Sequence, residues 1–153
     1  SNIMIIRQAT ISDLNQLVEL RKAQLIDEGS NPTPNIDHDL ERFFTDALTD
    51  KSLYQLLGVE NDTIIASGAI VYYPFPPSFT NPSGERAYVT NIYTHPDYRG
   101  RGIAQTIIKA LIKNVESRNI KKVFLAASTL GKPVYKKLGF EEAPEWMEIN
   151  YDL

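Results

Sequence analysis

From Ala87 to Arg118 the chain reads AYVTNIYTHPDYRGRGIAQTIIKALIKNVESR, and this stretch decides the predicted fold. It begins with β-forming residues, turns at His95-Pro96-Asp97 and passes through a loop of alternating arginine and glycine. Apolar residues then recur at helical spacing, which predicts a helix with one buried face. Two rows of side chains make up that face: Ile103, Ile107, Leu111 and Val115, with Ala104, Ile108 and Ile112 beside them. The glycines therefore precede a helix N-terminus.

The loop ahead of that helix has the residues of an anion site. The first turn of a helix carries backbone N–H groups without intrahelical partners and the positive end of the helix dipole, so it attracts a phosphate. Gly100 and Gly102 have no side chain to block a close approach, while Arg99 and Arg101 add charge that can bind phosphate oxygens. The loop predicts a cradle for a phosphorylated cofactor. The alternative is a surface turn that uses glycine for geometry and arginine for solubility.

Other well-known motifs do not fit this chain. A dinucleotide fingerprint needs a third glycine where Gln105 stands. A Walker A loop needs Ser or Thr after Gly-Lys, but Gly131-Lys132 is followed by Pro133. The sequence also has no G-x-S-x-G for a serine nucleophile.

Two motifs together resemble the GNAT superfamily of acyl-CoA-dependent N-acyltransferases. RGRGIA, from Arg99 to Ala104, matches the signature R-x-x-G-x-[GA], and the usual lead-in HPDY precedes it. Downstream, LAASTLGKPVYKKLGF is similar to the closing motif of the family, which ends in Tyr-x-x-x-Gly-Phe. Their order and separation are typical of the family. The resemblance implies an α/β fold with a mixed central sheet of about six or seven strands, flanked by helices on both faces.

The resemblance also implies a co-substrate, acetyl-CoA, and assigns its contacts position by position. Backbone groups of Ile92 and Thr94 are expected to pair with the pantetheine arm, and the Ile92 amide is a candidate oxyanion donor. Ser128 stands where many members carry an Asn that contacts the cofactor. The pyrophosphate is expected on the Arg99 side chain and on the amides of Gly100, Arg101, Gly102, Ile103 and Ala104. No metal is implied.

The rest of the chain alternates strands with helices, which indicates a layered α/β sheet within one domain spanning residues 1–153. Strands are expected at 3–9, 53–59, 63–73, 121–126 and 145–151. A first helix is expected from a capping box, Thr10 with Asp13, to Gly29. A second begins at a cap supplied by Asp37 or Asp39, and a short helix at 130–138 has Pro133 in its first turn.

Two irregular features carry functional expectations. In the central strand Ala87 and Val89 share one phase while Ile92 has the other, which indicates a β-bulge near Thr90-Asn91. In the resembling family such a bulge leaves a slot for the pantetheine arm. The Pro-rich loop 73–84 is expected to overhang the acceptor site, because long ordered loops tend to be functional. Its alternative role is to fold back on the core.

Composition restricts the classes of function. The 153 residues are 42% apolar and 23% charged, with a formal net charge of −3, which disfavours a nucleic-acid binder. The absence of cysteine excludes disulfides and thiol nucleophiles and is compatible with the cytoplasm. No run approaches the roughly 18 apolar residues of a membrane span, so a membrane is not expected as partner. A nucleic acid is not expected either, because of the net negative charge.

The chemistry of acyl transfer points to particular side chains. A phenol with a pKa of about 10 stays protonated at neutral pH and can donate to a departing thiolate. Tyr135 matches the position where many GNAT enzymes place this general acid; its alternative role is core packing. Glu28, Glu85 and Glu148 are candidate bases, each of which could instead be a solvated carboxylate.

We therefore expect an N-acetyltransferase that transfers acetyl from acetyl-CoA to a primary amine by direct attack in a ternary complex. The alternative is a non-catalytic acyl-CoA-binding sensor or interaction module of the same fold. The acceptor, a small-molecule or peptide amine, cannot be read from the sequence, although Asp27, Glu28, Glu41 and Glu145 would attract a cation. A homodimer is common in such proteins and is left open.

Overall fold

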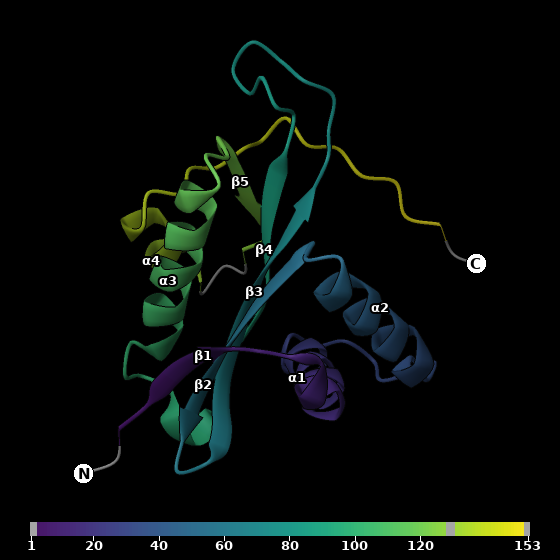
Figure 1. The fold of residues 1–153 in the computed structure, drawn as a ribbon, viewed down its shortest axis with the longest axis vertical. Coiled ribbons are helices and arrows are strands. Elements are labelled where there is room, and N and C mark those ends of the chain that lie inside the picture. The colour runs from purple at the N-terminus through teal and green to yellow at the C-terminus, as the bar shows by residue number, and fades with distance from the viewer. Residues whose placement is uncertain (1–2, 128–130, 152–153) are drawn as a thin grey trace.

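The computed structural model describes residues 3–127 and 131–151 as a twisted sheet between two helical layers (Figure 1). The strands are β1 (Ile5–Gln8), β2 (Leu53–Glu60), β3 (Thr63–Tyr73), β4 (Arg86–Thr94) and β5 (Lys122–Leu125). The helices are α1 (Leu14–Asp27), α2 (Asp37–Thr49), α3 (Ile103–Ser117) and α4 (Lys132–Lys137). Two 3-10 turns, Ile11–Asp13 and Pro96–Tyr98, precede α1 and the Arg-Gly loop.

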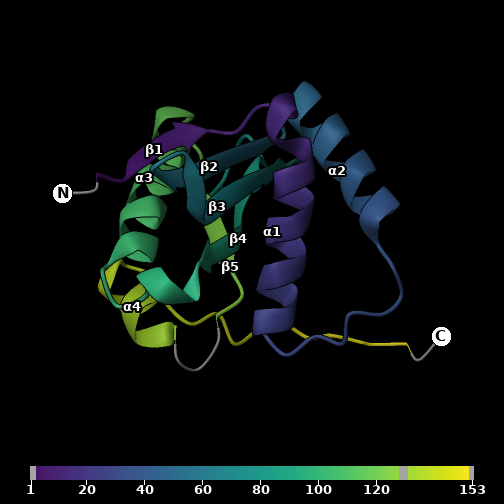
Figure 2. The same ribbon diagram turned by 90° about the horizontal axis from the view of Figure 1, so that it is seen from below.

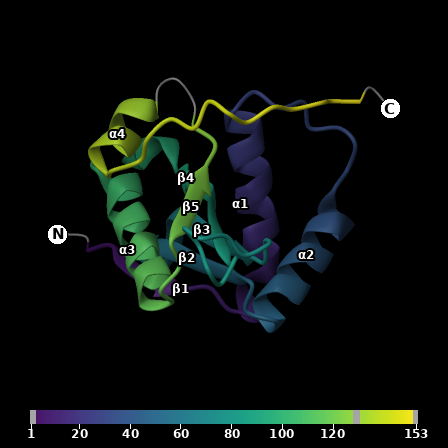
Figure 3. The ribbon, with the colours of Figure 1, turned by 90° about the horizontal axis from the view of Figure 1, so that it is seen from above.

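The sheet has the order β1-β2-β3-β4-β5, and its neighbours are antiparallel except for the parallel pair β4 and β5. Helices α1 and α2 cover one face, while α3 and α4 lie on the other (Figures 2 and 3). The apolar row predicted for α3 is buried, with Ile107 and Leu111 fully covered against the sheet. Leu17 and Phe44 anchor the opposite layer. The predicted mixed sheet with helices on both faces is confirmed.

The N-terminal helix begins and ends where the sequence indicates. The Asp13 carboxylate accepts a hydrogen bond from the Thr10 amide at 2.8 Å and two from the Arg7 guanidinium at 2.9 Å. At the other end Gly29 has a φ of 93°, and the Ser30 amide donates to the Leu25 carbonyl. This is the Schellman arrangement that ends many helices.

The cap predicted for the second helix is wrong, by one position for Asp37 and by three for Asp39. Asp37 and Asp39 both lie in the first turn of α2, and the N-cap is Ile36, which has no capping side chain. The Asn35 side-chain oxygen accepts the Asp37 amide at 2.8 Å and takes over this role. The two carboxylates still face the positive end of the helix dipole, which explains their place in the first turn.

The predicted bulge is present in β4. Ala69 pairs with Thr90 and Ser67 pairs with Tyr93, so Gly68 faces both Asn91 and Ile92. Asn91 takes a φ of 56°, and its carbonyl accepts a hydrogen bond from the Ser67 hydroxyl. A Cβ on Gly68 would lie 2.6 Å from Ile107 Cγ2, so glycine lets α3 approach the sheet opposite the bulge.

The last predicted strand is wrong. Residues 145–151 form no strand, and the sheet has five strands within the described residues rather than six or seven. The segment is extended but exposed, and it leads away from the body of the molecule (Figure 1). A strand needs a hydrogen-bonding neighbour, and in this chain no neighbouring strand lies beside the segment among the described residues.

Candidate functional site

The Arg-Gly loop leads directly into an uncapped helix N-terminus. Gly100 and Gly102 have φ values of 78° and 74°, a region that other residues avoid. A Cβ on either would meet nothing within 4 Å, so these positions need glycine for backbone geometry and open onto free space. Gly102 is the N-cap of α3, and no side chain of the described residues caps the first turn. The first-turn amides therefore remain available to an anion.

The two arginines of the loop differ in their surroundings. Arg99 donates to the Thr94 carbonyl at 3.1 Å and forms an ion pair with Asp27 at 2.9 Å, which ties the end of β4 to the end of α1. The Arg99 side chain is 45% exposed and has five N–H donors, so it keeps donors beyond these two contacts. The Arg101 guanidinium lies 5.1 Å from the centre of the Tyr98 ring. The Arg101 side chain therefore lies beside Tyr98 of the HPDY turn.

Strand β4 is longer than its parallel pairing with β5. Among the described residues, this pairing runs from Arg86 with Lys122 to Val89 with Leu125. Ile92 and Thr94 therefore lie past the last paired position, on the strand edge that faces the β5 side. Their backbone is placed where an extended ligand could pair with it.

The Tyr-x-x-x-Gly-Phe motif has a structural explanation in α4. Gly139, with a φ of 99°, follows the helix, and the Phe140 amide donates to the Tyr135 carbonyl at 3.0 Å. The two rings meet edge to face with 6.0 Å between their centres. This is a Schellman end with its usual apolar contact, so glycine and phenylalanine fix the position of the tyrosine.

Tyr135 and Glu28 come from distant parts of the sequence, and the charge of Glu28 acts on the Tyr135 hydroxyl. Burial raises the pKa of the Tyr135 hydroxyl above its ordinary value, and the negative charge of Glu28 raises it further. Glu28 directly follows α1, and its Oε1 accepts a hydrogen bond from the Gln24 side chain at 3.0 Å. The Tyr135 phenol can act as a proton donor, and the Glu28 carboxylate can act as a proton acceptor.

The other two predicted carboxylates lie elsewhere. Glu85 precedes β4 at the end opposite Thr94, roughly 25–30 Å away along the strand, and pairs with Arg118 at 2.9 Å. Glu148 is exposed in the segment after α4. The structure therefore brings only Glu28 together with Tyr135. Ser128 lies outside the described residues.

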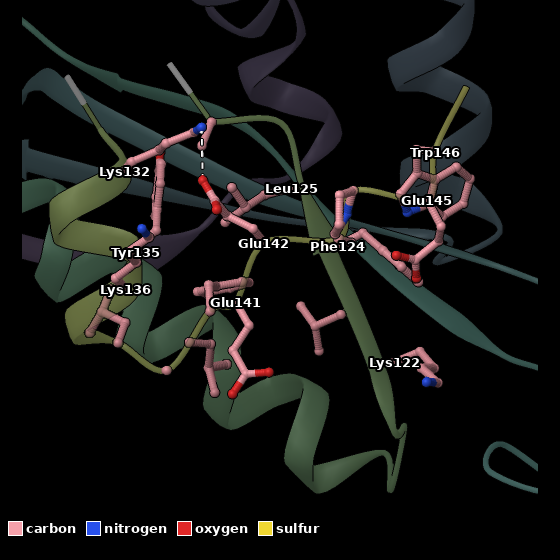
Figure 4. Close-up of a pocket in the computed structure, with 18 of the residues that line it drawn as sticks. Lys122, Phe124, Leu125, Lys132, Tyr135, Lys136, Glu141, Glu142, Glu145 and Trp146 are labelled. Atoms are coloured by element: carbon pink, nitrogen blue, oxygen red, sulfur yellow. Dashed lines mark hydrogen bonds and ion pairs between the residues drawn. The ribbon is translucent and has the colours of Figure 1, made fainter. Parts of the chain in front are cut away.

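A trough of about 900 Å³ lies between β5, α4 and the segment that follows α4 (Figure 4). Tyr135 and Lys132 border it on the α4 side, and Phe124 and Trp146 border it on the β5 side. Lys132 forms an ion pair with Glu142 at 3.0 Å. One side of Tyr135 therefore faces the open space of the trough.

Sequence reasoning missed a polar line along α1. The Arg21 guanidinium donates to Gln24 Oε1 at 2.9 Å, and Gln24 in turn donates to Glu28. Gln24 is buried, so its amide links the two charged groups. The spacing of these residues, three and four apart, is a helical stripe that could have been noticed as the polar counterpart of the apolar face.

The Pro-rich loop 73–84 is expected to overhang the acceptor site. Among its residues, Tyr73 at the end of β3 lines a second cavity, beside α1 and α2. None of its residues lines the trough of Figure 4. Within the described residues no group of His, Asp and Glu is placed to hold a metal ion. No helix of that part is long and apolar enough to cross a membrane.

Comparisons with known proteins agree with this geometry. Glucosamine 6-phosphate N-acetyltransferase of Trypanosoma brucei brucei is 30% identical over 87 residues, which are 57% of this chain and 57% of that protein. An uncharacterized N-acetyltransferase, ycf52, of Pyropia yezoensis is 32% identical over 43% of this chain and 38% of that protein. The matched segments thus span between about two fifths and three fifths of these relatives.

Solved structures match over nearly the whole chain. The crystal structure of a predicted acetyltransferase with acetyl-CoA from Clostridium acetobutylicum is 45% identical, with a TM-score of 0.94 over 97% of this chain and 96% of that one. A GCN5-related N-acetyltransferase from Ralstonia eutropha shares the fold, with a TM-score of 0.88 at 23% identity over 97% of this chain and 99% of that one. The model of the acetyltransferase (GNAT) family matches residues 15–140, and the chain therefore belongs to that family.

Proposed function

We propose that this protein transfers an acetyl group from acetyl-CoA to a primary amine by direct attack. The observation that carries the proposal is the convergence of three features at one end of the sheet. They are the uncapped first turn of α3, the bulge in β4, and Tyr135 under the charge of Glu28. The similar Clostridium protein, crystallised with acetyl-CoA, supports the choice of acyl donor.

The residues of the chain fit the parts of acetyl-CoA. The diphosphate would lie on the amides of Gly100 to Ala104, with Arg99 and Arg101 supplying positive charge. The pantetheine arm would extend along Ile92 and Thr94, which lie past the last pair of β4 with β5 among the described residues. This path carries the thioester to the bulge.

The reaction needs two proton movements. The amine nitrogen attacks the thioester carbonyl, a C–N bond forms and the C–S bond breaks. Glu28, directly or through a water, takes the proton that the amine loses, and the Ile92 amide would stabilise the oxyanion. Tyr135 gives its proton to the thiolate, and its raised pKa keeps that proton in place at neutral pH. The products are an amide and free CoA.

Two variants and one control test these roles. Tyr135→Phe should lower kcat by about 10²–10⁴-fold while CoA binds as before, because only the hydroxyl is removed. Glu28→Gln should lower kcat near neutral pH by about 10²-fold or more. Glu85→Gln, the same change at the far end of β4, is the control and should leave kcat unchanged. Full activity in Tyr135→Phe would exclude the assigned acid.

The alternative is a module that binds acyl-CoA without turnover. A panel of amines that includes polyamines, amino sugars, glucosamine 6-phosphate, amino acids and peptides separates the two functions when free thiol is measured. Release of CoA with at least one amine supports the enzyme. Binding of acetyl-CoA without release in any case would favour the sensor.

A further inference from the structure

A cavity of about 360 Å³ opens on the α1 and α2 face of the sheet, on the opposite side of β4 from the α3 helix. Its volume is within the range of small-molecule sites. Thr90 and Asn91 belong to its lining, so the cavity meets the β4 bulge. Its remaining main contributors are Arg21 of α1, Phe43 of α2 and the tyrosines Tyr73 and Tyr88.

The walls of this cavity are aromatic and only partly covered. Phe43 is 43% exposed, although its neighbour Phe44 is buried in the core. Tyr73 and Tyr88 are half-buried. Large aromatic surface that the core leaves uncovered gains free energy when a ligand of similar character removes it from water.

Arg21 is the one charged side chain in this lining. Its guanidinium donates to Gln24 and forms no ion pair with any described carboxylate. A partly buried guanidinium with spare N–H groups binds a carboxylate well and repels a second cation. Glu28 lies two helical turns further along α1, about 10 Å along the axis, on the same polar line.

We propose that the acceptor is an amine that carries both an apolar, aromatic-sized body and a carboxylate. The body would fill the space between Phe43 and the tyrosines, the carboxylate would pair with Arg21, and the amine would face the bulge and Glu28. This inference rests on the proposed acetyl transfer and adds the substrate class. It contradicts the simpler expectation that the acidic residues near α1 select a purely cationic amine.

The test compares amines that differ only in the carboxylate. Tryptophan and phenylalanine are paired with tryptamine and phenethylamine, and kcat/KM is measured by thiol release. The intact enzyme should prefer each acid by about ten- to hundredfold, the range expected for a charged hydrogen-bonded pair. Arg21→Gln should bring that ratio close to one, because it should lower kcat/KM for the acid more than for the matching amine without a carboxylate. Arg42→Gln, the same change at an exposed position of α2 outside the cavity, should keep the preference.

Each result has a clear reading. A preference for tryptamine, or an Arg21→Gln variant that keeps the preference for the acid, would overturn the inference. Acetylation of polyamines or amino sugars alone would also overturn it while leaving the proposed function intact. If no amine of the panel releases CoA, the proposed function fails, not only the substrate class.

Discussion

Helix α3 and the arm, residues 141–151, both carry large apolar residues, but they have opposite surroundings. Leu111 of α3 is completely buried, whereas Met147 of the arm is almost completely exposed. The helix packs against the sheet of its own chain, and the arm contacts its own chain through Trp146 with Phe124 and through the ion pair of Glu142 with Lys132. An apolar pattern therefore shows that a surface needs a cover, but not which molecule provides it.

The largest effect should come from the α3 side of this comparison. Leu111→Ala removes a fully buried side chain next to Ile107 and should lower the free energy of unfolding by about 2–5 kcal/mol. Urea denaturation followed by circular dichroism measures the loss. A loss below about 1 kcal/mol would mean that α3 is not the main cover of this face.

An intermediate effect is expected where a buried carboxylate is bound by its own chain. Arg7 and the Thr10 amide hold the pKa of Asp13 below its ordinary value. This contribution to stability is therefore present above a pH of about 4 and is lost as the pH falls through the lowered pKa. Asp13→Asn should cost about 1–2 kcal/mol at neutral pH, reduced because Arg7 is partly exposed.

Thermal melts across the acid range check the sign of that prediction. The intact protein should lose stability relative to Asp13→Asn as the pH falls below about 4. Parallel curves for the two proteins over the whole range would show that the Arg7–Asp13 pair does not contribute in this way.

The smallest effect is expected in the arm. Met147→Ser should change the free energy of unfolding by less than about 0.5 kcal/mol, because the Met147 side chain is 96% exposed. Urea titration at low protein concentration is the measurement. A loss near that of Leu111→Ala would erase the difference between the two regions, because the arm would then be packed within its own chain.

Local patterns predicted much of this molecule. The helical period placed α3, the change of phase between Val89 and Ile92 placed the bulge, and the glycines placed the loop at the helix start. The short helix predicted to end at residue 138 ends at Lys137, because a helix end depends on residues close in sequence. These features follow from short-range backbone geometry.

Contacts between distant segments could not be predicted in the same way. The ion pair of Arg99 with Asp27 and the approach of Glu28 to Tyr135 depend on how α1 packs beside β4. The strand expected at 145–151 failed because β propensity does not supply a pairing partner. The same limit hid the aromatic cavity beside Arg21, whose walls come from four separate elements.

The most direct test of the proposed site follows the backbone amides of the Arg-Gly loop during a titration with CoA. Nuclear magnetic resonance of isotope-labelled protein should show its largest shifts at Gly100, Gly102, Ile103 and Ala104, and pantetheine without phosphates should not produce them. If CoA binds while these amides keep their positions in the spectrum, the diphosphate is held elsewhere and the proposed site is wrong.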